Sequence, residues 1–276
     1  MKSKLAAILV ALATTSGVVA NAEPKIFDET PLGQWRFELT PYLFLPTSTE
    51  GSSVIDGVGG DLDLDLQDVL SLLQGAASVR FEAWSGNWGI ITDAYYVYLN
   101  PNDTLTLPGP TSGTIDVDAD IRQGWLTLLG ANRIAKGTNA AGRSYFVDAA
   151  AGVKWNSLEQ TVEIDVTVPP GGGVTQGQTL GGTETWWEPT IALRGALEVA
   201  DRWTLVGLAE LGGFGVNGND LQYLVRLGAD WQAWEKNSLR FGWQFYGIDY
   251  SSGSGTEEFT YDVDQHGLYL GLTVRF

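Results

Sequence analysis

VDQHGLYLGLTVRF, residues 263–276, is the stretch of sequence that decides the fold. From Leu268 to Phe276 every second residue is apolar, and the residues between them are small, polar or aromatic. A period of two with one continuous apolar face is typical of a β-strand that has an apolar environment on one side. The stretch therefore predicts a strand whose leucine face lies either in a protein core or against lipid.

The same alternation recurs in nine earlier segments, and together they give ten predicted strands. These lie near 35–45, 77–84, 88–98, 115–131, 145–155, 183–198, 203–214, 220–233, 238–250 and 263–276. Short turns join some neighbours, whereas long acidic or glycine-rich segments join others. Such a division is typical of a membrane barrel with both termini on the periplasmic side. We predict an all-β fold: a transmembrane up-and-down antiparallel β-barrel of ten strands, with eight or twelve as alternatives.

Aromatic spacing separates a membrane barrel from a soluble one. Trp88 and Tyr98 end one apolar face, and Tyr145 and Trp155 end another, each pair ten residues apart. At ~3.3 Å per residue and a tilt near ~40°, this spacing spans about 25 Å of height, the thickness of an outer-membrane apolar band. A soluble lipocalin-like barrel, with its apolar faces inward, has no need of this spacing.

The first residues predict export. Lys2 and Lys4 precede an apolar run from Leu5 to Ala13, and Ala20-Asn21-Ala22 forms a small-x-small cleavage site. This order is typical of a secretory signal peptide. We expect three segments: the signal peptide at 1–22 with cleavage near Ala22, a periplasmic lead-in at 23–34 and the barrel at 35–276.

Composition narrows the classes of function. The net charge is −17, and loss of the two signal-peptide lysines makes it −19. So acidic a chain is a poor partner for nucleic acid. The sequence has no cysteine, so it forms no disulfides. Its 35 glycines and 11 tryptophans suit a curved barrel with aromatic residues at the membrane boundary.

The second half of the sequence carries a family resemblance. Trp187-Glu188-Pro189, then Glu210-Leu211-Gly212-Gly213-Phe214-Gly215, then Gly242 through Tyr250 and a final Phe276 follow in order. In these features the chain resembles an uncharacterised family of outer-membrane β-barrel proteins of Gram-negative bacteria. The resemblance implies location and architecture, without an assigned activity. It also implies that Tyr269 and Phe276 belong to the assembly signal read by the barrel-insertion machinery.

The predicted strand phases bring charged side chains into the lumen. The proposed lumen network consists of Arg36, Glu38, Arg80, Glu82, Asp93, Arg122, Asp148, Glu188, Arg194, Glu210, Arg226 and Arg240, and Lys154 and Arg275 share the same phase. Arg80 and Asp93 lie at similar heights above one turn and are expected to meet. Two interpretations stay open: structural ion pairs that fill a narrow barrel, or a charged constriction that binds a ligand.

Metal and catalytic sites have weaker support. The runs Asp61/Asp63/Asp65, Asp116/Asp118/Asp120 and Glu257/Glu258 could hold Ca²⁺ or Mg²⁺, but alternate acidic residues are more simply one solvated face of a strand. Hydrolysis would need a base such as the single histidine, His266, with Asp264 or one of Ser251, Ser252 and Ser254. No G-x-S-x-G motif is present. We therefore predict no metal site, no cofactor and no enzymatic activity.

The sequence as a whole predicts a monomeric protein of the outer membrane, surrounded by lipid and lipopolysaccharide. Its role is either structural or the transport of small solutes, as in a porin. The alternatives are a surface-binding protein that acts through acidic external loops and, third, an outer-membrane hydrolase.

Overall fold

The computed structural model describes residues 31–106, 114–167 and 176–276. The predicted signal peptide and most of the lead-in lie outside these residues. The described elements are β1 (Arg36–Ile55), β2 (Val58–Asp65), α1 (Leu66–Leu72), β3 (Leu73–Ser85), β4 (Trp88–Leu99), β5 (Asn102–Thr106), β6 (Thr114–Thr138), β7 (Ser144–Thr167), β8 (Gln176–Ala200), β9 (Trp203–Val216), β10 (Asn219–Trp231), β11 (Asn237–Ser252), the 3₁₀ turn η1 (Gly255–Glu257) and β12 (Phe259–Arg275).

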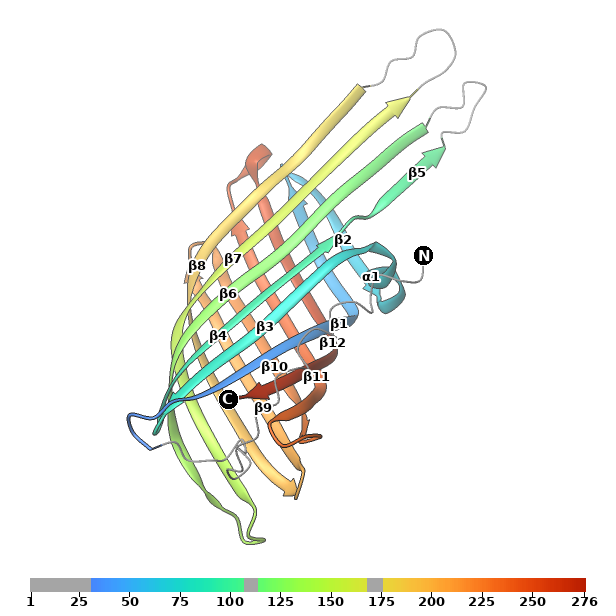
Figure 1. The fold of residues 1–276 in the computed structure, drawn as a ribbon. Coiled ribbons are helices and arrows are strands. Elements are labelled where there is room, and N and C mark those ends of the chain that lie inside the picture. The colour runs from blue at the N-terminus through green and yellow to red at the C-terminus, as the bar shows by residue number, and fades with distance from the viewer. Residues whose placement is uncertain (1–30, 107–113, 168–175) are drawn as a thin grey trace.

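Ten of the described strands close into a ring. Its order is β1, β3, β4, β6, β7, β8, β9, β10, β11 and β12, and β12 returns to pair with β1 (Figure 1). Every neighbouring pair is antiparallel, as in Leu39 opposite Val274 where the ring closes. The remaining two strands, β2 and β5, pair outside this ring with β1 and β6. The predicted all-β, up-and-down antiparallel barrel is confirmed, and the closed ring contains ten of the described strands.

The two ends of the barrel differ. At the turn end, four short links at residues 86–87, 139–143, 201–202 and 232–236 join β3–β4, β6–β7, β8–β9 and β10–β11. At the opposite, loop end, β6, β7 and β8 extend well beyond their neighbours (Figure 1). These strands have 25, 24 and 25 residues, whereas about 9–11 suffice to cross a bilayer. A β-sheet therefore projects from the loop end.

The segment 46–75, predicted as a long loop, is mostly regular structure. β1 continues to Ile55 and turns into β2 at Asp56 and Gly57, which have φ angles of 50° and 75°. An Asp-Gly pair with both φ angles positive suits a tight hairpin turn. The helix α1 follows β2, and Asp65 caps it by accepting from the backbone N–H of Gln67 and Asp68 at 2.7 and 2.9 Å.

The barrel wall has a seam, a place where β1 and β3 are only partly hydrogen-bonded to each other. β1 pairs with β3 from Arg36 to Pro41 and with β2 from Ser48 to Ile55. Between these stretches, residues 42–47 pair only with β12 among the described strands. The Ser78 hydroxyl donates to the carbonyl of Tyr42 at 2.5 Å in place of a backbone bond. α1 packs against β1 and β2 beside this seam.

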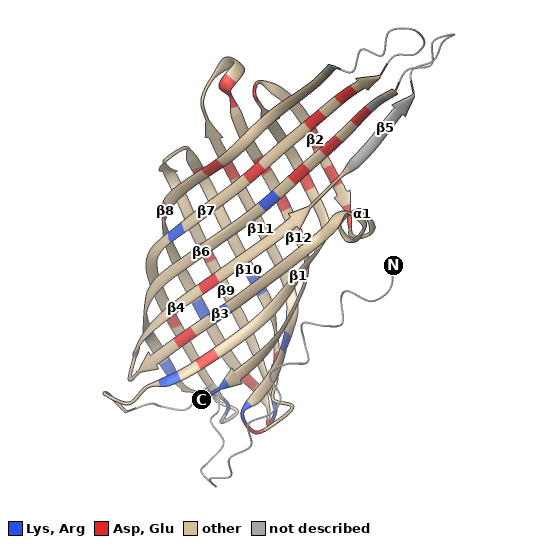
Figure 2. Cartoon of the chain, turned by 45° about the horizontal axis from the view of Figure 1, so that its top comes forward, with Lys and Arg blue, Asp and Glu red and all other residues tan. Residues whose placement is uncertain are grey.

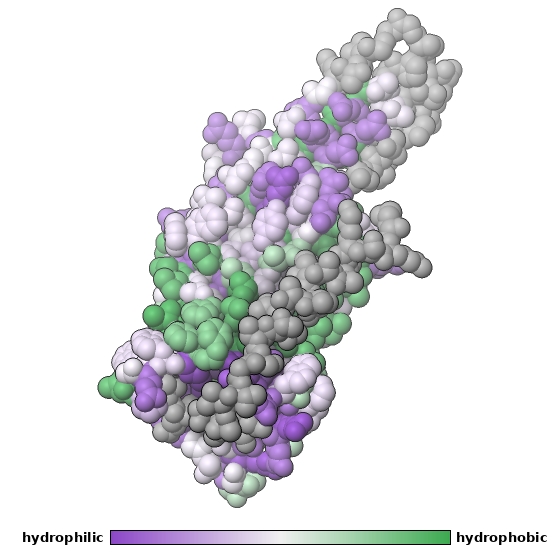
Figure 3. Space-filling view, in the orientation of Figure 1, coloured by the Kyte–Doolittle hydropathy of each residue, from purple (hydrophilic) through white to green (hydrophobic). Residues whose placement is uncertain are grey.

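The outer face of the ring carries an apolar band, part of which is green in Figure 3. Exposed aliphatic side chains alternate with inward residues on most strands of the ring, as at Leu126, Leu128, Val153, Ile191, Leu193, Leu205, Leu227, Leu268 and Leu270. Exposed Trp35, Trp88, Trp203, Trp231 and Trp234 lie toward the turn end, and Tyr96, Trp187 and Phe214 toward the loop end. This band between two aromatic girdles matches a transmembrane barrel. No helix in the described part of the chain is long and apolar enough to span a membrane.

Several aromatic residues fill the lumen, although the composition predicted them mainly at the membrane boundary. Tyr95 and Trp125 stack with ring centroids 4.0 Å apart, and Tyr246 stacks on Trp125 at 5.0 Å. Nearer the loop end, Trp186 and Tyr250 stack at 3.8 Å. All are buried members of one cluster. Stacked rings are rigid and bulky, so they leave little open space in this half of the lumen.

Candidate functional site

The lumen below the aromatic cluster, toward the turn end, is filled with charge. Inward positions of the ring place eight cations there: Arg36, Arg80, Arg133, Lys154, Arg194, Arg226, Arg240 and Arg275. They also place seven carboxylates: Glu38, Glu82, Asp93, Asp148, Glu188, Glu210 and Asp230. We call these fifteen residues the lumen network. Eight cations less seven anions leave one positive charge in excess.

Arg80 of β3 lies at the centre of the lumen network. Its guanidinium contacts Glu82 at 3.0 Å, Asp93 at 3.5 Å and Glu210 at 3.8 Å. Asp93 is the direct cross-strand partner of Arg80, so the predicted pair is confirmed. Glu210 lies on β9, five positions from β3 in a ring of ten, and is therefore on the opposite wall.

A second group of contacts crosses the lumen between β4 and β10. Arg226 contacts Asp93 at 3.1 Å and donates to the Tyr42 hydroxyl at 2.9 Å and to Gln244 Oε1 at 2.5 Å. Tyr42 in turn donates to Asp93 at 2.6 Å. Asp93 accepts hydrogen bonds from side chains of β1, β3 and β10. These bonds therefore fix the lumen side chains in one arrangement.

A third group lies under β6, β7 and β8. Asp148 accepts from Arg133 at 2.8 Å and from Arg194 at 2.7 Å. Arg194 also contacts Glu82, and both arginines lie over the rings of Trp84 and Phe146. Aromatic faces stabilise cations that burial removes from water.

Two smaller groups complete the lumen network. Near the turn end, Asp230 contacts Arg240 at 3.0 Å and Arg275 at 3.3 Å, and Glu38 contacts Arg36 at 3.3 Å and Arg275 at 3.7 Å. Below the aromatic cluster, Lys154 contacts Glu210 at 3.4 Å and faces Glu188 across the β7–β8 ladder. Glu188 accepts from the side chains of Trp186 and Asn219.

The structure brings eleven of the twelve residues proposed from sequence into the lumen network. Arg122 does not belong there: its side chain is 35 % exposed and pairs with Glu159 at 2.6 Å outside the barrel. The phase proposed for β6 was inverted, because Gln123 and Trp125 are buried inside. Beyond the membrane, water surrounds the sheet, so the apolar face of a strand turns inward there, whereas it faces lipid within the membrane.

Two members of the lumen network were missed from sequence. Arg133 lies beyond the predicted end of the strand near residue 131, but β6 continues through it to Thr138. Asp230 lies four residues after Arg226 on β10, so the same period of two places both inside. That signal was present in the sequence and would have found Asp230.

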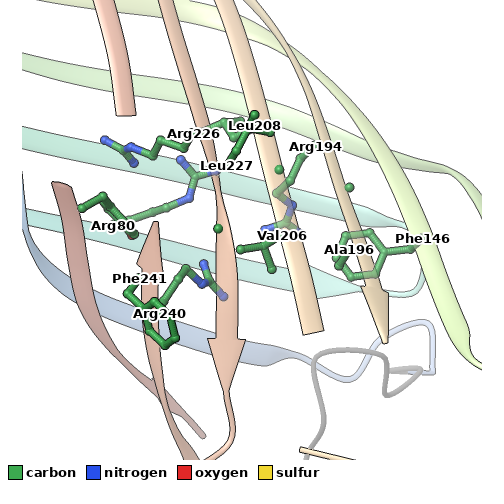
Figure 4. A pocket seen from close by; sticks show the side chains of 14 residues that line it. Arg80, Phe146, Arg194, Ala196, Val206, Leu208, Arg226, Leu227, Arg240 and Phe241 are labelled. Atoms are coloured by element: carbon green, nitrogen blue, oxygen red, sulfur yellow. The ribbon is translucent and has the colours of Figure 1, made fainter. Parts of the chain in front are cut away.

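A cavity lies within the lumen network beside β8, β9, β10 and β11 (Figure 4). The centres of water-sized molecules can occupy about 40 Å³ of it. Arg80, Arg194, Arg226 and Arg240 reach it, and its other lining includes Phe146, Ala196, Val206, Leu208, Gly228 and Tyr269. Ala196, Val206 and Gly228 occupy inward positions with small side chains or none, which explains why this part of the lumen is not filled.

The other chemistry considered from sequence lies outside the lumen. His266 faces outward beside Trp243 and Phe245, with Nδ1 3.4 Å from the Thr47 hydroxyl. Asp264 accepts a hydrogen bond from Tyr223 at 2.7 Å. In the described residues no group of three or more His, Cys, Asp or Glu side chains is arranged to hold a metal ion.

Similarity to known proteins is found at the level of structure and not of sequence. No protein-family model and no curated protein matches the sequence. Among solved structures, the outer-membrane protease OmpT of Escherichia coli matches with a TM-score of 0.48 and 10 % identity, over 90 % of this chain and 98 % of that one. The outer-membrane protein OprG of Pseudomonas aeruginosa matches with a TM-score of 0.33 and 12 % identity, over 90 % and 98 %. Both of these neighbours are outer-membrane proteins. The closed strand order of this chain establishes its barrel independently of them.

Proposed function

We propose that this chain is an outer-membrane β-barrel protein whose lumen is closed by ion pairs, so that its role is structural and it is no general diffusion pore. The apolar band between two aromatic girdles supports insertion in a bilayer. Short links at the turn end favour a periplasmic position for that end and for both termini. Its expected partners are outer-membrane lipid, lipopolysaccharide and, during assembly, the insertion machinery; the barrel is expected to be a monomer.

The observation that carries this proposal is the set of ion pairs across the lumen. Arg80–Glu210 and Arg226–Asp93 each join strands five positions apart in a ring of ten, at 3.8 and 3.1 Å. Water-filled pores need wider barrels, because a narrow lumen is filled by its own side chains. In this barrel, charged side chains fill the half of the lumen toward the turn end, and stacked aromatic rings fill the half toward the loop end.

Conductance in a planar bilayer tests the closed lumen. The refolded wild-type protein is expected to give no steady current, and the double variant Arg226→Ala/Asp93→Ala is expected to conduct. The matched control is Arg122→Ala/Glu159→Ala, which removes an ion pair outside the barrel and leaves the current at the wild-type level. A steady porin-sized current through the wild-type protein contradicts the proposal, and so does an equal current through both double variants.

Small-solute transport is the second candidate function, and the cavity in the lumen network favours it. A surface-binding role has support of a different kind: acidic residues follow the outer parts of β6 and β7 in the projecting sheet (Figure 2). These two roles concern opposite parts of the molecule. Solute flux assays address the first, and binding of cationic probes to intact cells addresses the second.

A further inference from the structure

We infer that the cavity beside β8–β11 is a binding site for a small organic monoanion, a carboxylate with a compact apolar body. This site goes beyond the proposed function, because binding within the lumen does not depend on whether the lumen conducts. The centres of water-sized molecules can occupy about 40 Å³ of the cavity, so the site admits only a compact ligand.

The lining of the cavity has two chemical characters. Guanidinium groups reach it from β3, β8, β10 and β11 (Figure 4). The side chains of Phe146, Ala196, Val206 and Leu208 are apolar and offer no partner to a second charged group. A ligand that satisfies both surfaces carries negative charge at one end and hydrocarbon at the other. Inorganic phosphate or a polyanion would leave charge against the apolar wall, which is unfavourable.

The charge count of the lumen network also favours a monoanion. The fifteen residues defined above include eight cations and seven carboxylates, so the lumen network holds one more positive than negative charge. Buried charges are retained in proteins when they are paired. One carboxylate in the cavity would make the lumen network neutral.

Free hydrogen-bond donors show where the carboxylate would bind. Arg80 is 3 % exposed, and its Nη2 is buried without a hydrogen-bond partner among the described residues. Arg240 bonds Asp230 through Nε and Nη2 and also lines the cavity. By contrast, Arg194 and Arg226 use their nitrogens on Asp148, Glu82, Asp93, Gln244 and Tyr42. Arg80 and Arg240 therefore bind the carboxylate, whereas Arg194 and Arg226 are held by their protein partners.

Calorimetric titration of the detergent-refolded, full-length barrel tests the site, with benzoate as the monoanion and benzamide as its neutral counterpart. Benzoate is expected to bind once per barrel and at least tenfold more tightly than benzamide. The variant Val206→Phe fills the cavity without removing a charge and is expected to weaken benzoate binding at least tenfold. The control Leu205→Phe places the same ring on the lipid-facing side of β9, where Leu205 is exposed, and should leave the affinity unchanged.

The titration also has outcomes that overturn the inference. These are the absence of saturable benzoate binding, equal binding of benzamide, tighter binding of inorganic phosphate than of benzoate, and unchanged affinity in Val206→Phe. A gel comparison of boiled and unboiled protein shows whether each variant is folded. If Val206→Phe fails to fold, Ala196→Leu replaces it, since Ala196 lines the same cavity from β8.

Discussion

Arg226 and Asp93 lie 133 residues apart in sequence and meet at 3.1 Å across the barrel lumen. They come from β10 and β4, which are on opposite walls. Asp93 also contacts Arg80 and accepts from Tyr42 and Trp125. The single carboxylate of Asp93 thus contacts four other side chains, which come from four other strands of the ring.

Removing either member of this pair is expected to destabilise the barrel. Arg226→Ala leaves Asp93 short of one counter-charge, and Asp93→Ala leaves Arg226 without its carboxylate; loss of one partner of a buried pair costs about 3–5 kcal/mol. The double variant is expected to lose less than the sum of the two single losses, because no unpaired charge remains. Urea unfolding of the refolded barrel in detergent measures all three. Additive losses near zero would instead indicate a hydrated pore.

The exposed pair Arg122–Glu159 is the internal comparison for that cycle. Its contact distance of 2.6 Å is shorter than that of Arg226–Asp93, yet surface pairs contribute only about 0–1 kcal/mol. Arg122→Ala is therefore expected to leave the urea midpoint close to that of the wild-type protein. The comparison separates burial from distance as the cause of stabilisation.

Much of this fold follows from alternation within the membrane band. In β12, Leu268 and Leu270 are exposed while Tyr269 and Arg275 are buried, as the period of two predicts. The pairing of Arg80 with Asp93 also follows, because a tight turn fixes the register of the β3–β4 hairpin. Where one face contacts lipid and the other contacts the lumen, the sequence specifies both.

Prediction from sequence is weaker outside the membrane band, and the reason is physical. In β6 the apolar face points to lipid at Leu126 and Leu128, but the inward positions nearer the loop end include Val117 and Ala119, which are partly buried. The surroundings of one strand change from lipid to water along its length. The apolar face therefore moves from the outer to the inner side without any break in the strand. Because of this reversal, the sequence pattern predicted Arg122 inside the lumen. The strand β2 was likewise predicted as part of a loop.

The terminal aromatic residue is predicted to matter for assembly. Phe276 is 61 % exposed, stacks on Phe37 at 5.7 Å and exchanges backbone hydrogen bonds with it where the ring closes. Phe276→Ala is expected to lower the membrane-inserted fraction in cells several-fold, because it alters the proposed signal for the insertion machinery. Phe245→Ala, another outward aromatic position, is the control. Quantitative blotting of outer-membrane fractions measures both, and equal losses would mean that Phe276 carries no special information.

Two facing glycines are predicted to be necessary for the wall between β10 and β11. Gly228 and Gly242 are direct partners, and a Cβ atom on Gly242 would overlap the backbone of Leu227 and Gly228. Gly242→Ala is therefore expected to destabilise the barrel by about 1–3 kcal/mol, as overpacking does. Gly60→Ala in β2 is the control, since a Cβ there meets no described atom within 4 Å. Urea midpoints that shift equally for both variants would contradict the close approach of these strands.

The pH dependence of the loop end is predicted from Asp249. Partial burial raises the pKa of Asp249 above its ordinary value, and the nearby carboxylates of Asp262 and Asp220 raise it further. Asp262 is the direct cross-strand partner of Asp249, and like charges in opposite positions destabilise a sheet. A raised pKa means that the folded protein favours the neutral acid. The stabilisation that comes from the protonated Asp249 side chain is complete below the unfolded-state pKa of about 3.9. It is lost as the pH rises through the folded-state pKa of Asp249.

The neutral variant Asp249→Asn should therefore be more stable than the wild-type protein at pH 7, and the difference should shrink as the pH falls toward about 4. Urea midpoints of both proteins at several pH values give this difference directly. Asp201→Asn is the control, because Asp201 lies at the turn end and contacts Arg143 at 3.0 Å. This contact joins opposite charges, so removing the charge of Asp201 should not stabilise the barrel at pH 7. A constant difference between Asp249→Asn and wild type at all pH values would show that repulsion with Asp262 is not its cause.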